Sequence, residues 1–374
     1  MRLFGRKAAG PAARPALLRS MTGTIVNGDW PRNYEAQLRD AYLANPVAQR
    51  AVRLVAEGAG SVPIAAAPAE HGADRLVRTT SAGQGLIETA AAHLLLHGNA
   101  FIQILCDGEG APAELYALRP ERVTIEPDGR GWPAAYLYRA GESVTRLPTG
   151  DALGRPTIVH VKAFHPIDDH YGLGCLGAAA GAVAIHNAAT RWNKALLDNA
   201  ARPSGALVYD PGEAGAALSG DQYDRLKAEM EASFAGAINA GRPMLLEGGL
   251  KWQAMSLTPA DMDFVGLKAA AAREIALAFG VPPMLLGLPG DSTYANYSEA
   301  NRALWRLTII PMAEKILAAI AQGLRAWWPD LAMRPELDGV PALAADRERM
   351  WAQVAGADFL SGEEKRAMLG LEAR

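Results

Sequence analysis

The chain has 374 residues, half of them hydrophobic, and its formal net charge is −3. This length suits two or three compact units with buried cores. The charge argues against tight nucleic-acid binding, which needs a basic excess, and leaves a looser relation to DNA open. The two cysteines, Cys106 and Cys175, show neither metal-ligand spacing nor a disulfide framework and therefore indicate a reducing compartment.

The N-terminal segment begins with "MRLFGRKAAGPAARPALLRS", which is basic, rich in alanine and proline, and free of an apolar run of signal-peptide length. We expect residues 1–32 to form a loose arm. The longest uncharged run, Leu173 to Thr190, approaches the length of a membrane span. Because it consists mostly of alanine and glycine and contains His186 and Asn187, we expect no membrane helix there.

The next segment predicts helices followed by strands. Asn45 can cap a helix that has Pro46 in its first turn, and Gly58 and Gly60 are expected to end it. A second helix is predicted over "GLIETAAAHLLLHG", and Gly98 and Asn99 suit a C-terminal turn with positive φ. From Asn99 to Lys162 the signal is β, in the segments "AFIQILC", "ELYAL", "RVTIEP", "AAYLYRA" and "TIVHVKAF".

After Gly172 the pattern becomes that of long helices. The first is predicted over 173–202, and its small residues Ala180, Gly181 and Ala184 would let neighbouring helices pack closely. A compact insertion follows, with strand "PSGALVY", helix "GDQYDRLKAEMEASF", and strands "RPMLLEG" and "LKWQAMSL" joined by a hairpin turn. A second long helix, from about 259, ends at Gly280 and the two prolines that follow.

A polar loop, "LPGDSTYANY", separates this helix from a third one. Ser298 can cap the third helix, and Pro311 is expected to kink it. Near the C-terminus, Ser361 and Glu364 form the pattern of a capping box.

Three histidines and two aspartates gather in "HVKAFHPIDDHYGLGC", residues 160–175. One interpretation is a metal-dependent hydrolase that uses His160, His165, Asp168 and His170. A zinc site favours close, preorganised ligands, often two histidines one helical turn apart, whereas these spacings are five and five. We therefore favour a strand, a polar turn and a helix start. Since the chain also lacks a phosphate loop and a nucleophile–base pattern, we expect no catalytic residues, no metal and no cofactor.

Nine segments in order resemble the portal proteins of tailed bacteriophages, in the lambda-like siphophage branch. They are "NPVAQRAVRLVAEGAGSVP", "HLLLHGNAF", "ELYALRPERV", "IVHVKAF", "YGLGCLGAA", "NAARPSGALVY", "NAGRPMLLEGGLKWQAMSL", "REIALAFGVPPMLLG" and "YANYSEANRALWRLTIIPM". No single segment is decisive; the specificity lies in their common order over roughly residues 40–370.

The resemblance implies an α+β portal fold with an α/β wing, two long stem helices, a small α/β clip and a helical C-terminal crown region. The implied parts are these: an arm over 1–32, a wing over 33–172, stem helices over 173–202 and 259–287, a clip over 203–258, a tunnel loop over 288–297, and a long kinked helix, wing return and small crown over 298–374. Asp291, Ser292, Thr293, Tyr294 and Asn296 would then face the DNA channel, and the small residues of the first stem helix would pack in the ring.

The function implied is that of a portal subunit. Twelve copies would form a ring at one capsid vertex, and double-stranded DNA would pass through it during packaging and ejection. The implied partners are the terminase large subunit, a head-tail adaptor and the major capsid protein. The expected location is a virion or a phage-like gene transfer particle, assembled in the bacterial cytoplasm. The sequence does not distinguish a phage from a gene transfer particle as the source of the protein. A second possible function also stays open: a scaffold for protein partners, which would lack an axial DNA path.

Overall fold

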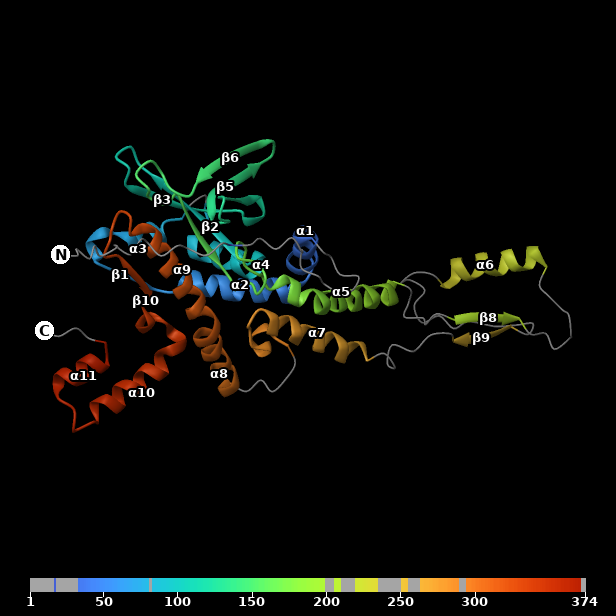
Figure 1. Ribbon diagram of the computed structural model, residues 1–374. Helices are drawn as coiled ribbons and strands as arrows, with labels where there is room; N and C mark the ends of the chain where they lie inside the picture. The colour runs from blue at the N-terminus through green and yellow to red at the C-terminus, as the bar shows by residue number, and fades with distance from the viewer. Residues whose placement is uncertain are drawn as a thin grey trace, which may run out of the picture. The chain divides into compact units, whose positions relative to one another are not determined.

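The computed structural model describes residues 17, 33–80, 83–198, 205–209, 219–234, 250–254, 263–288 and 294–370. The chain divides into two compact units (Figure 1). The large unit contains residues up to Ala180 and from Ala276 onward, and the small unit contains Gly181–Ile275. The chain passes between them within helix α5 (Leu176–Asp198) and again within helix α7 (Phe264–Ala278).

The large unit has a helical core made by α2 (Pro46–Ser61), α4 (Leu86–His97) and α9 (Ile310–Leu324), which contact one another. The side chain of Asn45 accepts hydrogen bonds from the backbone N–H groups of Val47 and Ala48, each at 3.0 Å, and Pro46 occupies the first turn of α2. The predicted cap is thus confirmed. One face of α2 is buried, at Ala48, Ala51, Val52, Val55, Ala56 and Ala59.

The prediction that Gly58 and Gly60 end this helix is wrong, because α2 continues through both to Ser61. A Cβ atom on Gly58 would lie 2.5 Å from Cδ1 of Ile309, and one on Gly60 would lie 2.9 Å from Cβ of Glu88. These glycines therefore allow neighbouring segments to approach α2 closely, and this gain outweighs their low helix propensity.

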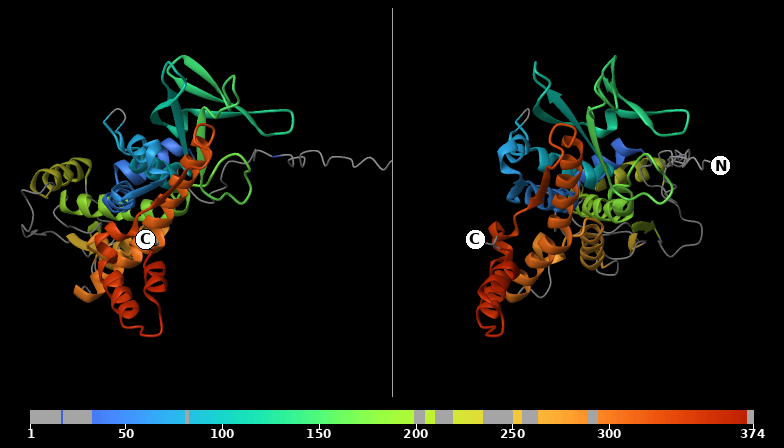
Figure 2. Two further views of the ribbon diagram at one scale, coloured as in Figure 1. Left: turned by 90° about the vertical axis from the view of Figure 1, so that its left-hand side faces the viewer. Right: turned by 60° about the vertical axis from the view of Figure 1, so that its left-hand side comes forward.

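Two three-stranded antiparallel sheets lie beside this helical core (Figure 2). In the first, β2 (Asn99–Cys106) lies between β3 (Pro112–Leu118) and β7 (Ile158–Lys162). In the second, β5 (Pro133–Ala140) lies between β4 (Val123–Pro127) and β6 (Ser143–Pro148). A shared apolar cluster connects them, made by Phe101, Leu118, Val123, Ile125, Tyr136 and Ile158.

The five predicted β segments are confirmed as β2, β3, β4, β5 and β7. Strand β6 was not predicted, since nearly all of it is exposed and it lacks an alternating apolar face. The remaining elements between residues 33 and 122 are short: α1 (Tyr34–Leu38), the π-helix η1 (Arg39–Leu43), β1 (Ile64–Ala67), α3 (Ala73–Arg78), and the 3-10 helices η2 (Ala69–His71) and η3 (Pro120–Arg122).

The third long helix has three parts: α8 (Tyr294–Leu304), the π-helix η6 (Trp305–Ile309) and α9. The predicted start at Ser298 is wrong, because Ser298 already lies one turn inside α8. The predicted kink at Pro311 stays a prediction; the helix changes from π to α geometry directly before this proline, which lacks an N–H group.

The helical run 295–324 is long and apolar enough to cross a membrane by length and composition. The buried face of α9 already packs in the core, however, where Ile316, Leu317, Ile320 and Leu324 are almost inaccessible to solvent. α9 contacts β7, α4 and β10 (Ala332–Pro335), and β10 pairs antiparallel with β1. These contacts account for its apolar face.

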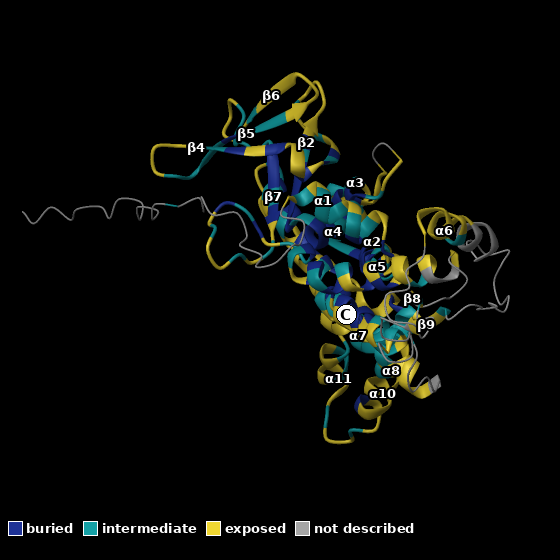
Figure 3. Ribbon diagram, turned by 90° about the vertical axis from the view of Figure 1, so that its right-hand side faces the viewer, coloured by how far each residue is buried: buried dark blue, intermediate teal, exposed yellow. Residues whose placement is uncertain are grey.

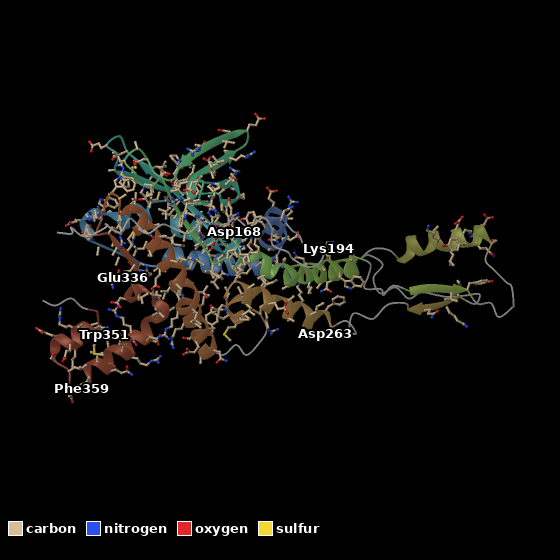
Figure 4. All side chains as sticks on the ribbon, viewed as in Figure 1. Asp168, Lys194, Asp263, Glu336, Trp351 and Phe359 are labelled. Carbon is tan, nitrogen blue, oxygen red and sulfur yellow. The ribbon has the colours of Figure 1, made fainter. Side chains whose placement is uncertain are left out.

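The C-terminal part of the large unit contains α10 (Ala344–Ala355) and α11 (Gly362–Met368), preceded by the 3-10 helices η7 (Leu337–Gly339) and η8 (Pro341–Leu343). The predicted capping box is confirmed, because Ser361 and Glu364 exchange side-chain and backbone hydrogen bonds. Figure 4 labels Trp351 on α10 and Phe359 between the two helices. The side chain of Phe359 is 87% exposed.

In the small unit, β8 (Gly205–Tyr209) pairs antiparallel with β9 (Leu250–Ala254), and α6 (Gly220–Phe234) lies between them in sequence. These three elements confirm the predicted strands "PSGALVY" and "LKWQAMSL" and the predicted helix. The predicted strand "RPMLLEG" and the hairpin turn after it lie outside the described residues. After α7, Gly280 adopts a φ of +66° and a 3-10 helix, η5 (Pro283–Leu286), follows, so the predicted helix stop is confirmed.

Candidate functional site

His160, the first residue of the histidine-rich segment, is part of the sheet core. Its ring stacks on Phe101 with 4.2 Å between ring centroids, and its Nε2 atom lies 3.0 Å from Oδ1 of Asn99. Burial, helped by the positive charge of Lys162, lowers the pKa of His160 to about 3. The side chain is therefore neutral at physiological pH and serves packing.

His165 and Asp168 build the turn that follows β7. The backbone N–H of Ile167 donates to Nδ1 of His165 at 3.2 Å. Oδ1 of Asp168 accepts from the backbone N–H groups of His170 and Tyr171, at 2.7 Å and 2.9 Å. Figure 4 labels Asp168 in this turn, ahead of α5. The polar residues thus direct the chain from a strand into a helix.

This arrangement answers the question of a metal site. Nowhere in the part of the chain that the structure describes do three or more His, Cys, Asp or Glu side chains converge in a way that would hold a metal ion. His165 and Asp168 bind backbone groups of their own turn, while His160 lies in the sheet core. The described residues therefore do not support the metal-dependent hydrolase interpretation.

Asn99 does not adopt the positive φ that the sequence suggested; it begins β2, and its side chain connects this turn to the end of α4, a role that sequence reasoning missed. Its side chain is fully buried; Oδ1 accepts from the N–H of Gly172 at 2.8 Å, and Nδ2 donates to the carbonyl oxygen of Gly172 at 3.2 Å. Gly98, with a φ of +82°, makes this approach possible, since a Cβ there would lie 2.5 Å from Gly172. The only sequence signal was an asparagine directly after a helix-ending glycine.

The small unit carries an apolar groove between α5 and α7, which we call the α5–α7 groove. It is defined by residues at helical spacing on α5 and by the start of α7: Ile185, Ala188, Ala189, Trp192, Phe264 and Leu267. Its volume is about 400 Å³. Trp192 and Phe264 stack with 5.9 Å between centroids, yet Trp192 remains 42% exposed and Leu267 43%. An aromatic and aliphatic wall of this kind is typical of contact surfaces.

The three small residues predicted to pack in a ring lie just ahead of the groove on α5. Ala180 is buried within the chain itself at 6% exposure, whereas Gly181 and Ala184 are half-buried. Gly181 and Ala184 are therefore the two that still have surface to offer to a second molecule.

The predicted channel loop is only partly described. Asp291, Ser292 and Thr293 lie outside the described residues. Tyr294 and Asn296 belong to the first turn of α8, so the helix begins inside the segment that we expected to be a loop. Asn296 is exposed there.

Comparison with solved structures identifies close relatives. A chain in the virion of a native gene transfer agent particle is 47% identical, with a TM-score of 0.72 over 92% of this chain and 95% of that one. A chain in the neck of the native particle, computed with C12 symmetry, matches equally well and is covered to 96%. A portal protein of the HK97 family from Corynebacterium diphtheriae shares the fold, at 16% identity and a TM-score of 0.60, over 84% of this chain and 99% of that one.

Comparison with curated sequences agrees. A protein of Rickettsia bellii described as uncharacterized is 39% identical over 349 residues, 89% of this chain and 88% of its own length. The probable portal protein of Streptomyces phage phiC31 is 25% identical over 284 residues, 71% of this chain and 61% of its own length. The family model described as phage portal protein matches residues 46–370. The chain therefore belongs to the phage portal protein family.

Proposed function

We propose that the chain is one subunit of a twelve-membered portal ring at one vertex of a phage capsid or a gene transfer particle, and that DNA enters and leaves through this ring. The observation that carries the proposal is the 47% identity to a chain of a particle neck with C12 symmetry. A duplex is roughly 20 Å wide, and only a closed ring of several copies encloses it. The role is structural, with no catalytic residues, metal or cofactor of its own.

We propose the parts of the portal fold that the resemblance implies, and we place their limits at helix ends. The wing covers 33–172, α5 and α7 are the stem helices, and the clip covers 203–258, including β8, α6 and β9. The tunnel loop narrows to 288–293, because α8 begins at Tyr294. The remaining residues form the long helix, the wing return and the crown with α10 and α11.

The contact between neighbouring subunits uses the stem. A cyclic ring is built from heterologous interfaces, in which one face of a subunit contacts a different face of the next. Gly181, Ala184 and the α5–α7 groove form a continuous run on α5 from small residues to exposed Trp192. We assign this run to the subunit interface, since burying its apolar wall removes surface that one chain leaves in water.

The test is ring formation by the full chain. Native mass spectrometry and negative-stain microscopy of the purified chain are expected to show closed rings. Gly181→Leu adds bulk at a tight contact, which costs about 1–3 kcal/mol, and a ring repeats this cost at every interface. We expect the variant to remain folded by circular dichroism but to give few rings. Gly362→Leu at the start of α11 is the matched control, because an added Cβ there would meet no atom within 4 Å. Normal ring formation by Gly181→Leu would show that this face of α5 is not part of the subunit interface. A wild-type chain that stays monomeric would contradict the proposal of a ring.

The tunnel loop is proposed to contact DNA. Asp291, Ser292 and Thr293 bear no positive charge, so they would meet the phosphate backbone without the strong attraction that brakes sliding. Replacing 291–293 by a single glycine leaves α8 intact, and we expect normal ring yield with a loss of nuclease-protected DNA in assembled particles. Unchanged DNA content would show that this segment is not the constriction.

Double-stranded DNA would be bound without sequence specificity. The terminase large subunit and a head-tail adaptor are proposed to meet the clip, and the major capsid protein to meet the wing. A pull-down of terminase by the ring, compared with a ring in which α6 carries Tyr223→Ala and Gln222→Ala, tests the first of these contacts. Equal capture by both rings would exclude this face of α6.

A further inference from the structure

The base of α5 is fixed to the end of α4 by backbone contacts within the large unit. The N–H of Ala163 donates to the carbonyl oxygen of Gly98, and the N–H of Cys175 donates to that of Leu95, both at 2.8 Å. Space is tight, because a Cβ on Gly174 would lie 2.6 Å from the carbonyl oxygen of Leu96. The side-chain amide of Asn99 binds backbone groups on both sides of this joint.

The hydrogen bonds of Asn99 determine which way its amide points. Oδ1 accepts from the N–H of Gly172, and Nδ2 donates to the carbonyl oxygens of Gly172 and His97, at 3.2 Å and 3.3 Å. In the reverse orientation the amide would place donor against donor and acceptor against acceptor. The orientation shown is therefore the one that satisfies all of these groups.

This orientation in turn determines the protons of two histidines. Nδ2 of Asn99 lies 3.1 Å from Nδ1 of His97, so the N–H directed at His97 is shared between its carbonyl oxygen and Nδ1, which is then an unprotonated acceptor. Oδ1 of Asn99 lies 3.0 Å from Nε2 of His160, which must then carry a proton and donate. Protonating His160 leaves its donor in place. Protonating His97 at Nδ1 sets an N–H against the N–H groups of Asn99 and removes the bond.

The charged and titratable groups around His97 come from several elements. Tyr34 of α1 meets its ring edge-on at 4.8 Å, and His93 lies one turn earlier on α4. Glu121 of η3, which pairs with Arg119, favours the charged form of His97, but burial outweighs it and lowers the pKa of His97. From the other side of Asn99, His160, Lys162 and His170 add no negative charge.

We propose that His97 and Asn99 form a proton-sensitive latch, which holds residues 172–176 at the base of α5 against the end of α4 and releases them when His97 is protonated. The latch is closed at neutral pH, because His97 is then an acceptor. Acidification below the pKa of His97 opens it, and since this pKa is lowered, opening begins below the ordinary histidine range of about 6.5.

The test is hydrogen exchange, followed by mass spectrometry, of the peptide covering 163–178 in the full chain at about pH 7.5 and about pH 5. Variants are compared with the wild type at the same pH, so that intrinsic exchange rates cancel. His97→Asn places an amide oxygen near the position of Nδ1 and cannot titrate. His97→Gln extends its amide past this position and lacks the acceptor. His93→Asn is the matched control, because it removes a buried histidine that does not touch Asn99.

At neutral pH we expect the wild type, His97→Asn and His93→Asn to exchange alike and His97→Gln to exchange faster. At about pH 5 the wild type and His93→Asn are expected to exchange faster than His97→Asn, and the difference should widen up to about tenfold for each further pH unit below the pKa of His97. Equal exchange of wild type and His97→Asn at both pH values would overturn the latch. So would loss of the pH response in His93→Asn. If His97→Asn does not fold, slow exchange of His97→Gln at neutral pH still refutes it.

Discussion

The two units differ in how much of their own side-chain surface they bury. The large unit encloses big side chains completely, among them Phe101, Ile102 and Leu115 in the sheets and Ile316 in α9. In the small unit, the described side chains that are buried all lie on α5 and α7: Ala182, Val183, His186, Ala189, Ala271, Ala272 and Ile275. None of the described side chains of α6, β8 or β9 is buried (Figure 3).

This difference shows which unit can fold by its own core. An isolated two-stranded pair such as β8–β9 is only marginally stable in water, and α6 presents Tyr223 at 60% exposure. The described side chains of α6, β8 and β9 therefore supply little of the apolar burial that offsets chain entropy. We expect these elements to gain burial from neighbouring copies in the proposed ring.

The largest expected effect is in the core of the large unit. Phe101 is fully buried between the two sheets, stacking on His160 and meeting Tyr136 edge-on. Phe101→Ala should lower the free energy of unfolding by about 3–5 kcal/mol, measured by urea denaturation. Tyr223→Ala in the small unit is the control and should leave this transition in place. An equal loss of unfolding free energy in both variants would show that the two units do not differ in this way.

The second effect is the response of the large unit to acid. Burial lowers the pKa of His93 to about 4 and that of His160 to about 3. The folded chain then binds fewer protons than the unfolded chain, so stability is full above about pH 6.5 and falls as pH drops toward these values, by up to about 1.4 kcal/mol per pH unit for each histidine.

His93→Leu isolates one of these contributions. Nδ1 of His93 is buried without a hydrogen-bond partner, so an apolar replacement of similar size removes a titrating group without breaking a bond. We expect the variant to match the wild type at neutral pH and to lose less stability at about pH 5, measured as the urea midpoint at both pH values. An unchanged pH slope would show that His93 is not protonated on unfolding.

The smallest effect concerns the α5–α7 groove. The stacked pair of Trp192 and Phe264 is half in water, and such pairs contribute about 0.5–1.5 kcal/mol beyond their buried area. Trp192→Ala should therefore raise the hydrogen-exchange rate of α5 only slightly and leave the urea midpoint of the large unit unchanged. The yield of rings, by contrast, should drop strongly. A large loss of stability in the isolated subunit would mean that the groove serves the fold of one chain.

Local signals in the sequence were reliable where one residue acts on its immediate neighbours. Asn45 caps α2, Gly98 ends α4, and Ser361 with Glu364 starts α11, since each pattern is completed by backbone groups within four residues. The strands of the sheet core were equally clear, because alternating burial leaves an alternating sequence. The order of the nine segments was enough to indicate the family.

The failures share a different cause. Gly58 was interpreted as a helix stop, but its missing side chain leaves room for Ile309, which lies 251 positions later in the sequence (309 − 58). Ser298 had the chemistry of a cap, yet the helix begins a turn earlier. Asn99 showed no sign of its role because its partner Gly172 is 73 residues away.

The sequence by itself determined the order of helices and strands, the main turns and the family, because propensity, periodicity and capping act over a few residues. Only the tertiary structure decided that His160 stacks in the sheet core while His165 binds its own turn, that glycines serve close packing, and that α5 and α7 leave an apolar groove open. Those outcomes depend on which distant segments meet and at what distance, and a pattern along the chain does not contain that information.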